Sequence, residues 1–154
     1  LIGMAYNAII RYSYASGNVL GGNLVGGLIG RNNSEVSVSN SYSTGGVDGK
    51  ESVGGLVGTN LDNSSISNSY AVGNISGTAD VGGLIGANGA TLESSYWDTE
   101  STNQSNGVGR GYSDGATGLT TSEMIGNAAK DNMPDFDWEE IWKTTDSYPV
   151  LFGN

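Results

Sequence analysis

The sequence contains no cysteine and no histidine, and it has only two prolines among its 154 residues. The absence of cysteine excludes disulfide bonds, a thiol nucleophile and a metal site built on thiolates. The absence of histidine excludes the His-Glu-x-x-His helix of a zinc protease. No apolar run approaches the roughly 20 residues of a membrane-spanning helix, and no signal peptide is visible. We therefore expect neither thiol chemistry nor insertion into a membrane.

Charged side chains are also scarce, at 14% of the residues against roughly 25% in ordinary globular domains. The balance is acidic, with 16 Asp and Glu against 6 Lys and Arg and a net charge of −10. Nucleic acids and anionic lipids attract basic surfaces, so we expect this chain to bind neither. Its 26 glycines, together with many Ser, Thr and Asn residues, favour tight turns and polar ladders over long helices.

A hexapeptide of the pattern Val-Gly-Gly-Leu-Ile/Val-Gly occurs at positions 25–30, 53–58 and 81–86. Its last residue is Gly30, Gly58 and Gly86 in turn, so the spacing between copies is constant. Residues 1–3 fit the end of an earlier copy, one position out of step, and we therefore expect the chain to be a piece of a longer protein. Tyr14, Tyr42 and Tyr70 have the same period, and Tyr96 follows slightly early. Repeats of this length indicate a solenoid, propeller or array.

Apolar and polar residues alternate between these markers, as in a strand with one buried face and one wet face. The alternation predicts that Leu56, Ile66 and Tyr70 point inward, whereas Ser67 and Ser69 point outward. We expect three short strands in each unit, joined by turns at Asn and Gly residues, which tolerate a left-handed backbone.

If each unit forms one coil, equivalent residues of successive coils stack about 4.8 Å apart. We therefore predict an all-β fold, namely a parallel β-helix (β-solenoid) of about four coils with 28-residue repeats. Asparagine amides can bond to one another along such a stack. The predicted ladders are Leu28, Leu56 and Leu84; Ile10, Val38, Ile66 and Leu92; Asn32, Asn60 and Asn88 at a corner; and Tyr14, Tyr42, Tyr70 and Tyr96.

The last four residues of each hexapeptide resemble the GLUG repeat, which is named for Gly-Leu-hydrophobic-Gly. These motifs are Gly27-Leu28-Ile29-Gly30, Gly55-Leu56-Val57-Gly58 and Gly83-Leu84-Ile85-Gly86. The resemblance covers roughly residues 1–98, which we expect to be the repeat region. GLUG repeats occur in large bacterial surface and secreted proteins, including adhesin-like proteins and some immunoglobulin-A-cleaving metallopeptidases. The resemblance implies an extracellular or cell-surface location in a bacterium.

The repeat ends after residues 96–98, and residues 99–154 form the rest of the same predicted domain. We expect residues 99–119 to be a loop excursion, followed by a capping box at Thr120 and Glu123 and a short helix over Ser122 to Lys130. The remaining residues are rich in aromatic side chains, and Tyr148 to Leu151 are expected to form a last strand. Because a solenoid ends on an open edge and an open core, we interpret this segment as a C-terminal cap.

Paired carboxylates are candidate catalytic groups, because many polysaccharide-cleaving enzymes are β-helices and glycoside hydrolysis uses two carboxyl groups. The candidates form two sets, namely Glu93, Asp98 and Glu100, and Asp48, Glu51 and Asp80. We favour solvated or turn-capping charges for both, so no catalytic residue is assigned. Calcium could occupy Asp48, Asp62, Asp80 and Asp98 at turns, but no calcium-binding motif occurs, and we assign no cofactor and no metal site.

Exposed aromatic rings could stack on sugars, and the candidates for ligand binding are Trp97 and Tyr112, with Tyr14 as a third. Trp97 falls at an outward position next to an inward Tyr96, so it either contacts a ligand or packs under the tail. We prefer packing under the tail.

The leading hypothesis is a non-catalytic structural or adhesive module of a large exported protein, acting as a rigid spacer or binding surface. Its partners would be the rest of a larger parent chain and host or matrix glycans or proteins. One alternative is a fragment of a carbohydrate-active β-helix, either a hydrolase or a lyase. A second alternative is a subunit of a filament that self-associates end to end.

Overall fold

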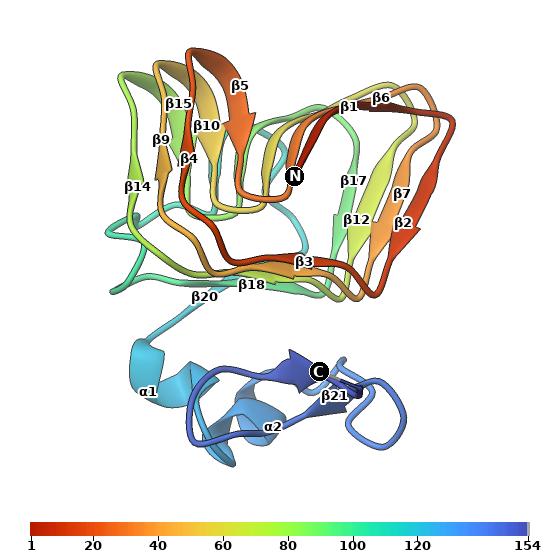
Figure 1. Cartoon of the computed structure of the whole chain (residues 1–154), viewed down its shortest axis with the longest axis vertical. Coiled ribbons are helices and arrows are strands. Elements are labelled where there is room, and N and C mark those ends of the chain that lie inside the picture. Colours follow the sequence, from red (N-terminus) through yellow and green to blue (C-terminus); the bar gives the residue numbers. More distant parts are fainter. Residues whose placement is uncertain (154) are drawn as a thin grey trace.

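The computed structural model describes residues 1–153 and is a β-solenoid with almost entirely parallel strand pairing (Figure 1). Its main sheet contains five strands, β1 (Ile2–Tyr6), β6 (Ile29–Asn33), β11 (Val57–Asn60), β16 (Ile85–Asn88) and β19 (Val108–Gly111). A three-stranded sheet lies beside it and consists of β5 (Asn23–Gly26), β10 (Glu51–Gly54) and β15 (Ala79–Gly82). The predicted all-β solenoid is therefore confirmed.

Three further sheets complete the cross-section of the solenoid. The first contains β2 (Ile9–Arg11), β7 (Ser37–Ser39), β12 (Ser65–Ser67) and β17 (Thr91–Glu93). The second contains β3 (Tyr14–Ala15), β8 (Tyr42–Ser43), β13 (Tyr70–Ala71), β18 (Ser95–Asp98) and β20 (Ala116–Leu119). The third contains β4 (Val19–Leu20), β9 (Val47–Asp48) and β14 (Ile75–Ser76). A full turn thus has five short strands, where the sequence pattern predicted three.

The length of each turn follows from the pairing along the main sheet. Ile2 pairs with Ile29, Ile29 with Val57, Val57 with Ile85 and Ile85 with Val108. The first three of these steps are nearly equal in length, whereas the step from Ile85 to Val108 is several positions shorter. Three regular turns are therefore followed by a shortened fourth turn. The prediction that residues 99–119 form a loop excursion is wrong, because β19 and β20 lie there and continue two of the sheets.

The glycines of the repeated hexapeptide allow neighbouring strands to approach closely where the chain bends toward the interior of the solenoid. A Cβ atom on Gly58 would lie 2.4 Å from the carbonyl oxygen of Gly30 and 2.6 Å from the carbonyl carbon of Leu24. A Cβ atom on Gly55 would lie 2.3 Å from the carbonyl oxygen of Gly83 in the next turn. No side chain fits at these distances, so the glycines permit the inward turn seen between β5 and the main sheet (Figure 1).

The interior contains two apolar clusters, one on each side of this inward turn. The larger one holds the predicted leucine ladder together with Val38, Ile66 and Leu92, and Ile10 packs against it. The smaller one is formed by Val25, Val47, Val53 and Ile75. Stacking of equivalent residues therefore buries both clusters along the whole solenoid.

The prediction that Tyr70 points inward is wrong. Ile66 and Ala71 belong to the larger interior cluster, whereas Tyr70 belongs to a separate cluster formed with the C-terminal segment. The cause is Asn68, which has a φ of 47° and forms a left-handed corner between β12 and β13. This corner breaks the two-residue alternation, so Tyr70 and the tyrosines in register with it face outward from the coil.

The C-terminal segment (residues 120–153) contains α1 (Thr121–Met124), α2 (Ala128–Asn132), β21 (Trp142–Lys143) and β22 (Val150–Leu151). Two short helices thus replace the single helix predicted over 122–130. The capping box is confirmed, because the amide of Thr120 donates to the Glu123 carboxylate at 2.7 Å. The strand predicted at 148–151 is present as β22, which pairs antiparallel with β21. Within residues 1–153, no helix is both long enough and apolar enough to cross a membrane.

The C-terminal segment packs on the side of the solenoid, against the sheet that carries the tyrosines (Figure 1). Residues 109–115 at the far end of the solenoid are exposed. The prediction that this segment closes the open end is therefore wrong, because it covers a lateral face instead. The exposed face of a tyrosine column is a large apolar surface, and burying it explains why the segment docks there.

Candidate functional site

An asparagine ladder runs through the buried corner of the solenoid. The amide of Asn32 donates to the side-chain oxygen of Asn60 at 3.3 Å, and the amide of Asn60 donates to Asn88 at 3.0 Å. Asn88 then donates to the carbonyl of Tyr112 at 2.7 Å, in the shortened turn. The ladder ends at the first turn, where Ala5 is in register with Asn32 and leaves the Asn32 side-chain oxygen buried without a donor. The ladder therefore joins turns and presents no exposed group to a ligand.

A serine ladder occupies the corner after each left-handed residue. The hydroxyl of Ser69 accepts the amide of Ser41 at 3.2 Å and donates to the carbonyl of Ser67 at 2.7 Å. Ser41 and Ser95 repeat these contacts in their own turns. Ser69 is fully buried, so the prediction that it points outward is wrong. A hydroxyl that links two turns in this way satisfies buried backbone groups that the corner leaves unpaired.

The rings of Tyr14, Tyr42 and Tyr70 stack in a column on the outside of the coil, whereas Tyr96 packs edge-on against Phe136. Ring centroids lie 5.1 Å apart between Tyr14 and Tyr42 and 5.0 Å apart between Tyr42 and Tyr70. The Tyr70 hydroxyl donates to the carbonyl of Pro149 at 2.6 Å, and burial raises its pKa. Burial and then the Asp135 carboxylate raise the pKa of Tyr96 to about 12, so this hydroxyl stays a donor, 3.1 Å from Asp135.

A groove of about 310 Å³ lies where the C-terminal segment leaves the N-terminal part of the tyrosine column uncovered. Tyr14 is 50% exposed at its open end. The lining combines aromatic rings with hydroxyl groups and consists of Tyr14, Ser16, Tyr42, Thr44, Tyr70, Thr145, Ser147, Tyr148 and Val150. Aromatic faces beside hydroxyls form the kind of surface on which sugar rings stack. The sequence pattern did not reveal Thr145 and Ser147, because nothing in the repeat places the C-terminal segment beside Tyr14.

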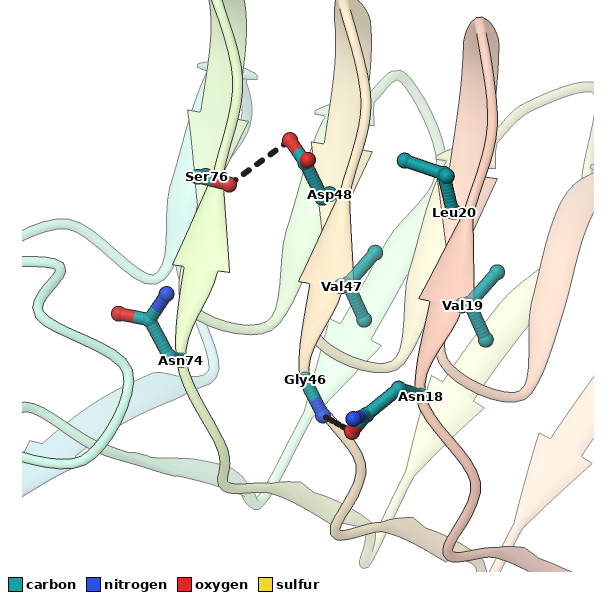
Figure 2. A pocket seen from close by; sticks show the side chains of 8 residues that line it. All are labelled: Asn18, Val19, Leu20, Gly46, Val47, Asp48, Asn74 and Ser76. Carbon is teal, nitrogen blue, oxygen red and sulfur yellow. Dashed lines mark hydrogen bonds between the residues drawn. The ribbon is translucent and has the colours of Figure 1, made fainter.

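A wider hollow of about 540 Å³ lies on the outer face of β4, β9 and β14 (Figure 2). The amide of Gly46 donates to the Asn18 side chain at 2.8 Å, and the Ser76 hydroxyl donates to Asp48 at 2.8 Å. Leu20 beside them is exposed. Asp48 is the one carboxylate in this lining, so the hollow lacks the acid pair that glycoside hydrolysis requires.

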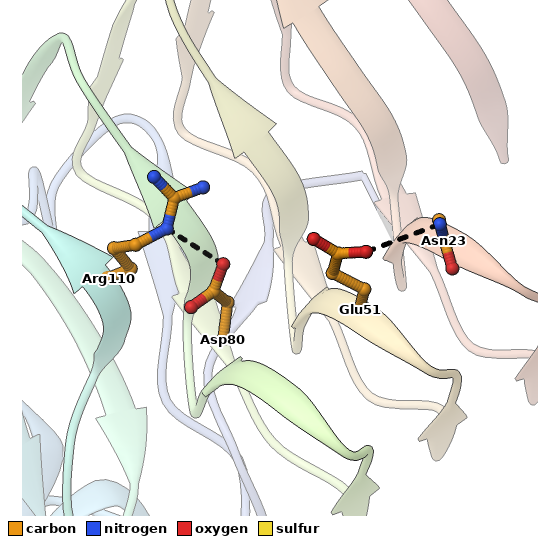
Figure 3. Close-up of polar contacts among 4 residues, drawn as sticks. All are labelled: Asn23, Glu51, Asp80 and Arg110. Atoms are coloured by element: carbon orange, nitrogen blue, oxygen red, sulfur yellow. Dashed lines mark hydrogen bonds and ion pairs between the residues drawn. The ribbon is translucent and has the colours of Figure 1, made fainter.

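The other two carboxylates of this predicted set lie on β10 and β15 (Figure 3). Glu51 accepts a hydrogen bond from Asn23 at 3.4 Å. Asp80 forms an ion pair with Arg110 at 2.8 Å. Each of these carboxylates is thus held by a residue of a neighbouring turn.

Asp98 is the best-connected carboxylate and is fully buried. It accepts hydrogen bonds from Thr121 at 2.6 Å, from Tyr148 at 2.5 Å and from the amides of Glu100 and Ser101 at 2.8 and 3.0 Å. Burial raises its pKa, but these four donors outweigh burial and hold the pKa below its usual range. Asp98 thereby links the last turn of the solenoid to α1 and to the residues just before β22.

The remaining carboxylates of that set differ in their surroundings. Glu100 accepts the amide of Thr121 at 2.9 Å, and Glu93 lies exposed on β17. Among residues 1–153, no group of three or more acidic side chains is arranged to hold a metal ion. Asp98 and Glu100 are thus both held by hydrogen bonds from Thr121.

The two predicted ligand-binding aromatics have opposite environments. Trp97 is 7% exposed and lies inside the solenoid, where its ring contacts the backbone positions of Gly83, Gly107 and Gly118. It packs in the interior cluster of the solenoid and not in the cluster formed with the C-terminal segment. The predictions that it faces outward and that it packs under the tail are therefore wrong. Tyr112 is 69% exposed at the far end of the solenoid.

The repeat also has counterparts among known proteins. Residues 49–76 match the family model described as the GLUG motif. This match confirms the resemblance to the GLUG repeat at the second of the three hexapeptide copies, residues 53–58.

A curated relative is Halomucin of Haloquadratum walsbyi (strain DSM 16790 / HBSQ001), which is 43% identical over 61 residues. The match covers 40% of this chain and 1% of that protein, so the chain spans about 1% of the length of the curated relative it matches. Halomucin is archaeal, so this similarity does not support the predicted bacterial origin. No solved structure matches the chain.

Proposed function

We propose that this chain is a non-catalytic repeat module of a large exported surface protein, in which it acts as a rigid spacer. The observation that carries the proposal is that the repeated side chains make contacts within the solenoid and with its C-terminal segment. The asparagine, serine and leucine columns all serve contacts between turns, and the tyrosine column holds the C-terminal segment. The match to a short part of a very long relative supports a role within a larger chain at the cell surface.

Two measurements test this proposal. The purified chain is incubated with a panel of soluble polysaccharides, and the products are analysed by size-exclusion chromatography. We expect no change in polymer length, and release of oligosaccharides would overturn the non-catalytic part. Small-angle scattering at low protein concentration tests the rigid spacer, since the scattering curve is expected to fit one rigid shape. A flexible ensemble under native conditions would contradict it.

A second candidate function is adhesive, and the groove beside Tyr14 favours it. The exposed ring of Tyr14, flanked by Ser16, Thr44 and Ser147, suits a neutral glycan. Titration with glycans, followed by tyrosine fluorescence, should show binding that Tyr14→Ala weakens. Phe152→Ala removes an aromatic ring of the same 50% exposure outside the groove lining and serves as the matched control. Equal binding by the Tyr14→Ala variant would exclude this groove.

A further inference from the structure

The hollow on the outer face of β4, β9 and β14 is formed by two columns of outward side chains (Figure 2). Val19, Val47 and Ile75 are in register with one another and pack in the smaller interior cluster. Because side chains alternate along a strand, the residues before and after them point outward. The first column is Asn18, Gly46 and Asn74, and the second is Leu20, Asp48 and Ser76. Both columns lie on the side of the solenoid and cross three of its turns.

Gly46 leaves a gap in the middle of the first column. Its neighbours in the adjoining turns are Asn18 and Asn74, whose strands lie two spacings, or about 9.6 Å, apart. A Cβ atom on Gly46 would make only ordinary contacts, the nearest at 3.4 Å to the Asn18 side chain and to the carbonyl oxygen of Asn74. Packing therefore does not require a glycine here, in contrast to the glycines of the repeated hexapeptide.

The side chains around this gap keep hydrogen-bonding groups that the fold does not use. Within residues 1–153, Asn18 accepts the amide of Gly46 at 2.8 Å, which leaves its own amide nitrogen available. Asp48 accepts the Ser76 hydroxyl at 2.8 Å through one oxygen, which leaves the other available. The Asn74 side chain is exposed and has no hydrogen-bond partner in the same part of the chain. The gap thus offers donors and acceptors together.

This combination selects the chemistry of a ligand. An anion would meet Asp48 in a chain of net charge −10, which repels it. An ammonium group would use the acceptors and leave the two asparagine amides without partners. Hydroxyl groups both donate and accept, so a ring with several hydroxyls matches the whole set. The volume of about 540 Å³ falls within the roughly 300–1,000 Å³ of small-molecule sites, and Leu20 adds an apolar wall.

We propose that this hollow binds a neutral sugar residue. The ring lies over Gly46, with Asn18 and Asn74 on its two sides and Asp48 accepting a hydroxyl. The inference goes beyond the spacer role, because a spacer needs no ligand. It also differs from the groove beside Tyr14, which lies on another sheet and is lined by aromatic rings. The hollow would allow the module to hold a glycan along the side of the solenoid.

Nuclear magnetic resonance of the isotope-labelled chain tests the proposal. The chain is prepared with Tyr14→Ala, so that the groove beside Tyr14 does not contribute, and is titrated with the methyl glycosides of glucose, galactose and mannose. We expect at least one of these to shift the backbone amide signals of Gly46, Asp48 and Asn74 in a saturable manner. Glucosamine and glucuronic acid serve as the charged counterparts and should bind more weakly than the neutral glycosides.

Two variants in the same background test the residues. Asn74→Ala removes the unused amide and should weaken binding about fivefold, as expected for one hydrogen bond. Gly46→Ala places a methyl group in the gap without a tight contact and should weaken binding at least as much. Asn106→Ala, at an exposed position outside the hollow, and Gly3→Ala, which has open space around the new Cβ, are the matched controls and should bind normally. Circular dichroism verifies that all variants are folded.

The outcomes separate this site from the spacer role. If no neutral glycoside shifts these amides, or if Asn74→Ala and Gly46→Ala bind as well as their controls, the site is excluded while the rigid spacer stands. Tighter binding of glucosamine or glucuronic acid would overturn the assignment to a neutral sugar.

Discussion

The hydroxyl of Tyr148 donates a hydrogen bond to the buried carboxylate of Asp98, 50 residues earlier in the chain. This contact joins the last regular strand of the tyrosine sheet to the residues that precede β22. Because Thr121 donates to the same carboxylate, one side chain fixes both α1 and the C-terminal hairpin on the solenoid. The position of the C-terminal segment therefore depends on an ionised group.

Replacing Asp98 should loosen the C-terminal segment. Asp98→Asn removes the charge and presents an amide to donors that need an acceptor, so we expect about 2 kcal/mol of destabilisation. Chemical denaturation followed by tryptophan fluorescence measures the change, since Trp142 is fully buried in this segment. Asp114→Asn, at an exposed position of the far end, should leave stability unchanged. Equal effects of the two variants would contradict the role of Asp98.

The same carboxylate predicts a pH dependence of stability. The folded state lowers the pKa of Asp98, so the folded state favours its ionised form. Its contribution is complete above the unfolded pKa of about 3.9 and is lost as the pH falls through the lower folded pKa. The unmodified protein should thus lose stability below about pH 4 more steeply than Asp98→Asn. Parallel pH profiles of unfolding free energy for the two proteins would refute this.

Interrupting the asparagine ladder at its middle should weaken the solenoid itself. Asn60→Ala leaves Asn32 without its acceptor and Asn88 without its donor inside a buried corner. We expect a loss of about 2 kcal/mol in the free energy of unfolding. Asn74→Ala changes the same residue type at an exposed position and should cost much less. If both variants unfold at the same denaturant concentration, the ladder does not stabilise the fold.

The glycines of the repeated hexapeptide should not tolerate substitution by a residue with a side chain. Gly58→Ala would place a Cβ within 2.7 Å of three backbone atoms of an earlier turn, which cannot move without separating β5 from the main sheet. We expect about 3 kcal/mol of destabilisation or more, visible as a lower thermal midpoint. Gly17→Ala, which has open space around the new Cβ, is the control. A Gly58→Ala variant as stable as Gly17→Ala would exclude this close approach.

Periodicity made much of this fold predictable from the sequence. A column repeats one residue type at one spacing, so pairs such as Asn32 with Asn60 and Ile66 with Val38 followed from the constant period and are in register. The outward direction of Tyr70 could not be predicted in this way. The two-residue alternation assumes an extended strand, and the left-handed corner at Asn68 interrupts it. The sequence pattern did not predict the shortened turn, because residues 107–109 retain only Gly-Val-Gly of the repeated hexapeptide.

The candidate site was much less predictable than the fold. Contacts such as Tyr70 with Pro149 and Asp98 with Tyr148 join residues 79 and 50 positions apart, and no repeat relates the two segments. The sequence identified an aromatic C-terminal segment but not the face on which it packs. The lateral position became clear only once the tyrosine column was known to point outward.

Trp97 should be the largest single contributor to the end of the solenoid. The same inward column holds Ala15, Ser43 and Ala71 in earlier turns, so the tryptophan fills space that the shortened turn would otherwise leave empty. Trp97→Ala removes this ring and its hydrogen bond to the carbonyl of Gln104, and we expect about 4 kcal/mol of destabilisation. Hydrogen exchange should show faster opening in β19 and β20, with β6 and β7 little changed. Trp138→Ala is the matched control in the C-terminal segment, where Trp138 is partly buried. Uniformly faster exchange throughout the solenoid would show instead that Trp97 supports the whole stack.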